Sequence, residues 1–140
     1  MTDSLKIEYL ISGEDFTRAG EASGDVKAKL KMLGVNPEVI RKVSIAMYEG
    51  EINMVIHANG GVITVIITTT DITMILKDNG PGIKDLDLAM QAGYSTASEN
   101  VRALGFGAGM GLPNMKKYSD EMNIETEIGV GTTVTMKVYF

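Results

Sequence analysis

Cysteine and tryptophan are absent from this chain, and histidine occurs only once. Without thiolates, the sequence excludes iron–sulfur clusters, thiol catalysis and cysteine-ligated zinc, and a single histidine excludes most histidine-based metal sites. Because no disulfide is needed, we expect a cytoplasmic location. The chain also lacks a basic N-terminal region followed by an apolar block, so we expect no signal peptide. Its longest apolar region, 62–76, is interrupted by polar residues and is too strand-like to span a bilayer.

Basic residues are outnumbered by acidic ones, and the formal net charge is -5. Long-range attraction to nucleic acid or to an anionic membrane is therefore not expected, and any bound nucleotide must be held by local geometry. The chain has 140 residues, of which 44% are hydrophobic and 22% charged. These are ordinary values for a globular protein, and they predict a single domain over residues 1–140.

Hydrophobic spacing predicts strands and helices in mixed order along the chain. Strands are expected at 5–11, 61–69, 71–77, 122–128 and 132–140. Helices are expected at 15–33, 36–58, 84–91 and 111–118, the second starting at an Asn36 N-cap. Residues 93–111 show neither the helical nor the strand spacing of hydrophobic residues, which is typical of a functional surface loop. This order predicts one antiparallel or mixed sheet with helices on one face.

The second half of the 36–58 helix is apolar on nearly every side, so its polar residues need an explanation. Glu49 and Asn53 are four residues apart and share one helix face. The Asn53 amide oxygen is a hard ligand suited to Mg²⁺, and Glu49 could orient or deprotonate a hydroxyl. The alternative is an incidental pair on a solvent-facing surface. Glu51 points elsewhere, and we expect it to be solvated or partner-facing, whereas His57 is expected to be a hydrogen-bonded structural residue.

The sequence Asp-Asn-Gly-Pro-Gly at 78–82 directly follows a predicted strand. An ionised aspartate only accepts hydrogen bonds, so Asp78 suits an exocyclic amine such as that of adenine. Gly80 and Gly82 would allow the backbone to approach a ring closely. The alternative interpretation is a tight Pro-Gly turn that ends the strand.

Alternating glycines at 105–111 precede a predicted helix, whose N-terminal amides could bind phosphate. The spacing matches neither the dinucleotide fingerprint nor a Walker loop, so neither site is supported. A glycine-rich hinge is the alternative. Lys116 and Lys117, one turn later, complement the C-terminal end of that helix.

Three blocks, 49–53, 78–82 and 107–111, resemble in order and spacing the N, G1 and G2 boxes of the GHKL ATPase superfamily. The sequence Gly-Val-Gly-Thr-Thr at 129–133 is similar to the last glycine motif of that superfamily, and the likeness runs from about Asp15 to the C-terminus. The resemblance implies an α+β fold, a two-layer α/β sandwich of the GHKL ATPase type. Its sheet would be mixed and mostly antiparallel, with helices on one face.

Within that superfamily the chain is most similar to the anti-sigma regulatory factors, the small serine/threonine kinases of bacterial partner-switching pathways. The resemblance implies ATP and Mg²⁺ as cofactors, with Asn53 at the metal, Glu49 as the catalytic base and Asp78 at adenine. It makes 93–111 the ATP lid. The further nucleotide contacts that it implies are Gly80, Gly82, Ser95, Thr96, Gly107, Gly109, Met110, Gly111 and Thr132.

The implied substrate is a serine or threonine on an anti-sigma-factor antagonist or scaffold protein. The resemblance leaves open a phosphatase or a sigma factor as a further partner, as well as a homodimer. Residues 104–108 carry no charge where sigma-binding kinases would have a Glu-Arg pair, and the run Gly-Met-Gly-Leu-Pro-Asn at 109–114 is closer to kinases that act on a scaffold. Arg102 is a candidate cation for the γ-phosphate.

Two other functions stay open. One is a nucleotide-gated binding module with little or no kinase turnover. The other is a detached histidine-kinase ATPase domain, although the chain has no dimerisation helix with a phospho-acceptor histidine.

Overall fold

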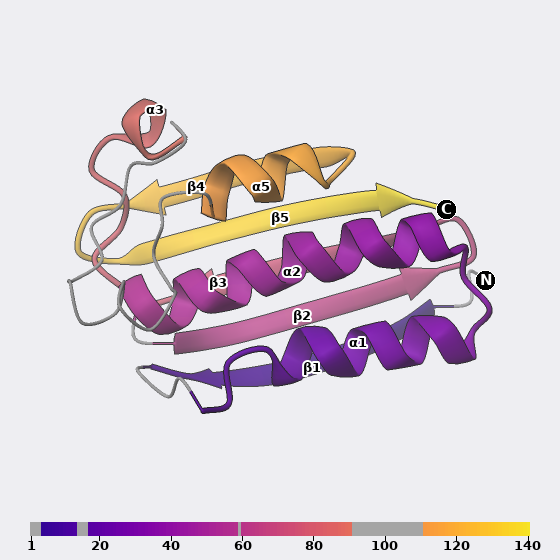
Figure 1. The fold of residues 1–140 in the computed structure, drawn as a ribbon. Helices are drawn as coiled ribbons and strands as arrows, with labels where there is room; N and C mark the ends of the chain where they lie inside the picture. Colours follow the sequence, from indigo (N-terminus) through magenta and orange to yellow (C-terminus); the bar gives the residue numbers. More distant parts are fainter. Residues whose placement is uncertain (1–3, 14–16, 59, 91–110) are drawn as a thin grey trace.

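In the part of the chain that the structure describes, five strands form one antiparallel sheet, and helices cover one of its faces (Figure 1). The computed structural model describes residues 4–13, 17–58, 60–90 and 111–140. The strands are β1 (Ser4–Ser12), β2 (Gly60–Thr68), β3 (Asp71–Asp78), β4 (Glu121–Glu127) and β5 (Gly131–Tyr139), in the spatial order β1-β2-β3-β5-β4. The helices are α1 (Glu21–Met32), α2 (Pro37–His57), α3 (Leu86–Ala89) and α5 (Gly111–Lys117). The predicted two-layer α+β fold is confirmed, and every described pairing is antiparallel.

The core lies between the sheet and helices α1, α2 and α5. Alternate residues of each central strand face the helices, as the period of two predicts. The buried strand residues are Ile63, Val65, Ile67, Ile72, Met74, Leu76, Val134, Met136 and Val138. Their helical partners include Val26, Leu30, Val43, Met47, Met54 and Met115. The opposite face of the sheet carries the alternate residues, which are mostly polar but include Val62, Ile66 and Ile75. None of the helices in the described ranges is both long and apolar enough to cross a membrane.

Helix α2 begins where the sequence predicts. The Asn36 side chain accepts a hydrogen bond from the Glu38 amide at 2.8 Å, and Pro37 occupies the first helical position. Proline is tolerated there because that amide has no partner within the helix. The second half of α2 is buried, as expected.

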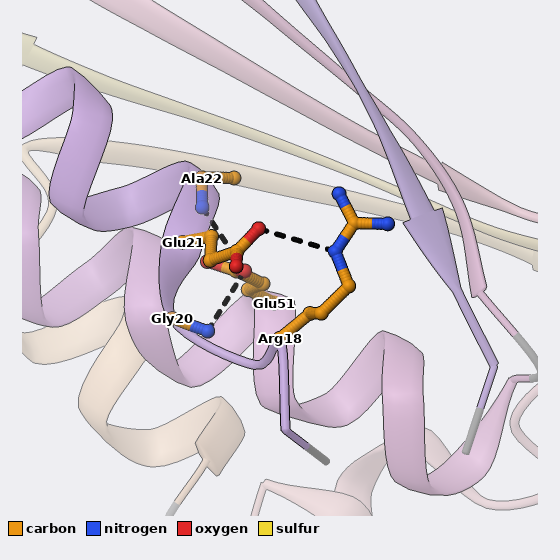
Figure 2. A network of polar contacts seen from close by, with 5 residues as sticks. All are labelled: Arg18, Gly20, Glu21, Ala22 and Glu51. Atoms are coloured by element: carbon orange, nitrogen blue, oxygen red, sulfur yellow. Dashed lines mark hydrogen bonds and ion pairs between the residues drawn. The ribbon is translucent and has the colours of Figure 1, made fainter. Parts of the chain in front are cut away.

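Helix α1 begins at Glu21, so the prediction of a helix from Asp15 is wrong within the described residues 17–20. Gly20 has a φ of 98°, a left-handed conformation that interrupts a helix and favours glycine. The cap of α1 comes from α2: Glu51 Oε2 accepts from the amides of Gly20 and Ala22, at 2.9 and 3.2 Å (Figure 2). Its other oxygen accepts from the Ser23 amide at 3.0 Å.

The expectation of a solvated or partner-facing Glu51 is therefore wrong, since its side chain is only 1% exposed. A carboxylate stabilises a helix N-terminus because the free amides there carry partial positive charge. Figure 2 also shows the exposed pair beside it, in which Arg18 Nε donates to Glu21 at 3.2 Å. Glu51 thus fixes α1 against α2.

A second polar contact ties α1 to the edge strand β1. Tyr9 Oη donates to Asp25 at 2.5 Å, and Lys29 Nζ donates to the same carboxylate oxygen at 2.6 Å. Burial, followed by the hydrogen bond and charge of Asp25, raises the pKa of the Tyr9 hydroxyl. The hydrogen bonds from Lys29 and Tyr9 lower the pKa of Asp25.

Helix α3 spans four residues, so the prediction of a helix over 84–91 is too long at its N-terminal side. Asp85 ends the preceding extended segment, because its side chain accepts a hydrogen bond from the Leu88 amide at 3.0 Å. Gln91 lies outside the described residues.

Candidate functional site

Four elements meet at one end of the sheet. Figure 1 shows the C-terminal half of α2, the end of β3 and the starts of β5 and α5 together at the left of the view. These elements carry the predicted site residues Glu49, Asn53, Asp78, Gly111 and Thr132. Residues from four separate parts of the chain are therefore gathered on one side of the molecule.

Glu49 and Asn53 face the first turns of α5. Glu49 Oε1 accepts a hydrogen bond from the Asn114 side-chain amide at 3.2 Å, and Asn53 Nδ2 lies 3.8 Å from the Met115 sulfur. Both side chains are half-buried, so the solvent-facing alternative is wrong. No residue in the described ranges donates to Glu49 Oε2 or to Asn53 Oδ1. With respect to the described residues, both oxygens can therefore accept from a ligand or coordinate one.

Gly111 lets α5 approach Asn53 closely. A Cβ atom added at Gly111 would lie 2.6 Å from Asn53 Nδ2 and 2.8 Å from Oδ1, closer than such atoms can pack. Glycine at this position therefore keeps the N-terminus of α5 next to the predicted metal-binding amide.

One carboxylate oxygen of Asp78 accepts hydrogen bonds from backbone amides, whereas the other accepts none from the described residues. Asp78 Oδ1 accepts hydrogen bonds from the amides of Gly80 and Thr132, at 2.9 and 3.0 Å. Within the part of the chain that the structure describes, no group donates to Oδ2. The turn interpretation and the base-reading interpretation are compatible, because one oxygen shapes the turn and the other can accept from a ligand.

The turn after Asp78 is packed against the β4–β5 connection. Gly82 has a φ of 82°, and a Cβ atom there would lie 2.6 Å from the Glu127 carbonyl oxygen. The Pro81 carbonyl accepts a hydrogen bond from the Gly129 amide at 2.9 Å. The 78–82 and 129–133 motifs are thus neighbours in the fold.

Thr126 joins the same two motifs, and the sequence patterns did not identify it. Its hydroxyl lies 2.9 Å from that of Thr132 and accepts a hydrogen bond from the Ile83 amide at 2.8 Å. Asn114, the partner of Glu49, was also missed. Its place in the first turn of a helix that follows a glycine run was the available signal.

The turn also touches the end of α2. A Cβ atom at Gly80 would lie 2.7 Å from the Ala58 Cα, so these two backbones are in direct contact. Ala58 follows Asn53 by five positions, or about 7.5 Å along a helix axis. Asn53 and Asp78 are therefore at the same end of the molecule.

His57 lies next to this contact, and burial lowers the pKa of its imidazole. It is half-buried at the last turn of α2, and a lowered pKa keeps it neutral near pH 7. The predicted contacts Ser95, Thr96, Gly107, Gly109 and Met110, together with Arg102, lie outside the described residues and stay predictions.

The protein oxygens at this site suit a metal ion that is also coordinated by the phosphates of a bound nucleotide. The described residues contain no group of three or more histidine, aspartate or glutamate side chains that could enclose a metal. Mg²⁺ usually keeps several waters and is bound by one or two protein oxygens together with substrate phosphates. The acceptor Asn53 Oδ1 fits that coordination.

Comparison with known proteins agrees with this geometry. Residues 39–140 match the family of histidine kinase-, DNA gyrase B- and HSP90-like ATPases. An anti-sigma F factor from Thermoanaerobacter sp. strain X514 is 36% identical over 143 residues, covering 99% of this chain and 94% of the relative. One from Clostridium kluyveri is 30% identical over 145 residues, covering 99% and 95%.

A similar fold occurs within the crystal structure of the RsbU and RsbW domains of Rv1364c from Mycobacterium tuberculosis. That structure matches 98% of this chain and 32% of its own longer chain, with a TM-score of 0.62 and 17% identity. The chain belongs to the histidine kinase-, DNA gyrase B- and HSP90-like ATPase family, and the relatives to which it is similar include anti-sigma F factors. Membership in this family implies that the chain binds ATP.

Proposed function

We propose that this protein binds ATP with Mg²⁺ and transfers the γ-phosphoryl group to a serine or threonine of a partner protein. The observation that carries the proposal is the position of Glu49 and Asn53 on one face of α2, against the N-terminus of α5 and at the same end as Asp78. A base and a metal ligand can position and activate the groups that react in such a transfer, and an acid at the adenine can hold the nucleotide in place.

Each residue has a distinct role in the proposed reaction. Asp78 Oδ2 accepts from the adenine amine, and Asn53 Oδ1 coordinates the metal. Glu49 accepts the proton of the partner's hydroxyl while the hydroxyl oxygen bonds to the γ-phosphorus. At the same time the bond between the γ-phosphorus and the bridging oxygen breaks, and that oxygen leaves with ADP. The Asn114 amide orients the Glu49 carboxylate through its hydrogen bond at 3.2 Å.

The partner class is inferred from the relatives. Several of them are anti-sigma F factors, and a protein of similar fold combines RsbU and RsbW domains. An anti-sigma-factor antagonist or scaffold protein is therefore the proposed substrate. The relatives' shared name also favours a sigma factor as a second partner.

The substitution Glu49→Gln tests the kinase proposal. It removes the proton acceptor but keeps side-chain size, so phosphate incorporation into an antagonist protein of the same organism should fall by about 10²–10⁴-fold. Incorporation is measured with γ-labelled ATP, and ATP affinity by calorimetry should change little. Glu125→Gln, on the exposed part of β4, is the matched control.

Two outcomes would contradict the proposal. Unchanged incorporation in Glu49→Gln would show that Glu49 is not the base. ATP-dependent partner binding without any incorporation by the unmodified protein would favour the nucleotide-gated binding module.

A further inference from the structure

We propose that a hollow between α1 and α2 docks an acidic segment of a partner protein, one in which carboxylates are interspersed with apolar side chains. The hollow has a volume of about 490 Å³. Its walls include Lys27 and Lys31 of α1 and Arg41 and Ile45 of α2, with Val35 from the connection between the helices.

The hollow is positively charged in a chain whose formal net charge is -5. Among the described residues that line it, three side chains are cationic and none is a carboxylate. Lys27 and Lys31 are exposed and one helical turn apart, and neither forms an ion pair within the described ranges. Lys29, between them in sequence, is instead paired with Asp25. Two lysine charges are thus left to attract a ligand of opposite sign.

The rest of the described lining is mostly apolar. It includes Val35, Pro37, Ile40 and Ile45, and the Ser44 hydroxyl already donates to the Ile40 carbonyl at 2.6 Å. A ligand there would gain contact both with these aliphatic groups and with the ammonium groups of Lys27 and Lys31. Those two contacts together select a chain that carries both carboxylates and apolar side chains.

The end of α1 adds further apolar surface beside Lys31. Met32 is 86% exposed and Leu33 is 56% exposed, although both are large hydrophobic residues. Exposed apolar side chains next to an uncompensated charge mark a surface suited to a protein partner.

Other ligand classes fit these residues less well. No described residue that lines the hollow is aromatic, so these residues offer nucleic acid bases no stacking platform. The lysines are exposed on flexible stems, so a small anion would stay hydrated rather than be enclosed. The rest of an acidic protein would repel an anionic membrane.

The hollow is distinct from the nucleotide site and does not depend on phosphoryl transfer. It is built on the first half of α2, whereas Glu49 and Asn53 belong to the second half. Arg41 and Asn53 are separated by about 18 Å along the helix axis. A partner could therefore occupy the hollow whether or not ATP is bound.

A selection experiment tests the proposal with the full chain. A library of random twelve-residue peptides displayed on phage is selected on the unmodified protein after depletion on Lys27→Glu/Lys31→Glu. We expect enriched peptides to be acidic and to contain leucine or isoleucine. A fluorescein-labelled enriched peptide should bind about tenfold more weakly to the double variant, with no effect of ATP.

Lys6→Glu/Lys137→Glu is the matched control, because it makes the same charge change on the opposite face of the sheet. Its peptide affinity should equal that of the unmodified protein, and circular dichroism should show that both variants fold. The proposal is overturned if no acidic peptide is enriched, or if both double variants bind equally. It is also overturned if Lys27 and Lys31 instead support binding of a DNA oligonucleotide or of phosphatidylserine vesicles.

Discussion

Glu51 shows what one buried carboxylate contributes to this fold. Its two oxygens accept three amide hydrogen bonds from the start of α1, and its side chain is nearly inaccessible to solvent. Amides at a helix N-terminus have no partner within the helix, so this side chain replaces the solvent they would otherwise bind. The start of α1 thus depends on a residue far away in the sequence.

The substitution Glu51→Gln should lower the free energy of unfolding by about 1–3 kcal/mol. Glutamine keeps the shape but turns one acceptor into a donor, which then faces a backbone amide of α1. Urea denaturation followed by circular dichroism measures the change.

Glu21→Gln provides the comparison for this measurement. Glu21 pairs with Arg18 on the surface, where the two side chains are 62% and 63% exposed, so its loss should have little effect on stability. Equal losses of stability in the two variants would contradict a structural role for the buried carboxylate.

At the scale of elements, the packing of α2 on the sheet depends on Gly50. A Cβ atom at this position would lie 2.2 Å from Leu76 Cδ2 and 3.1 Å from Met115 Cε. The helix, β3 and α5 therefore meet at a point where an added methyl group would displace the Leu76 side chain.

Gly50→Ala should destabilise the protein by about 1–3 kcal/mol through overpacking. Gly24→Ala makes the same change inside α1 at a position with nothing within 4 Å of the added atom, so it should stabilise by about 0.5–1 kcal/mol. Thermal unfolding monitored by circular dichroism shows whether each variant is less or more stable than the unmodified protein. A neutral or stabilising Gly50→Ala would contradict the packing described for α2.

The elements themselves could largely be predicted from local patterns. Alternation identified the strands, and the Asn36-Pro37 pair identified the start of α2, because both signals act over a few neighbouring residues. The start of α1 could not be predicted, since it depends on Gly20 and on a carboxylate contributed by Glu51 of α2. The burial of Glu51 was missed for the same reason.

At the scale of the whole molecule, the sequence predicted part of the site by spacing alone. The four-residue separation of Glu49 and Asn53 places them on one helix face in any fold that contains this helix. Their proximity to Asp78 could not be predicted from spacing, because it depends on the tertiary contact between Gly80 and Ala58. Only the family resemblance implied that arrangement. Asn114 and Thr126 were missed because their roles come from tertiary contacts.

The central claim is that an adenine nucleotide binds at this end of the sheet, with Asp78 accepting from the base. Asp78→Asn is the informative substitution, because an asparagine oxygen can still accept from the amides of Gly80 and Thr132. The turn should therefore persist. The substitution, however, replaces Oδ2 by an NH₂ group, which is a donor and would face the donor amine of adenine.

Calorimetric titration with ATP in the presence of magnesium tests this claim most directly. Asp71→Asn, at the opposite end of β3, is the matched control. We predict that the unmodified protein and Asp71→Asn bind ATP alike, and that Asp78→Asn binds at least about tenfold more weakly. Equal ATP affinity in Asp78→Asn and the unmodified protein would contradict the account.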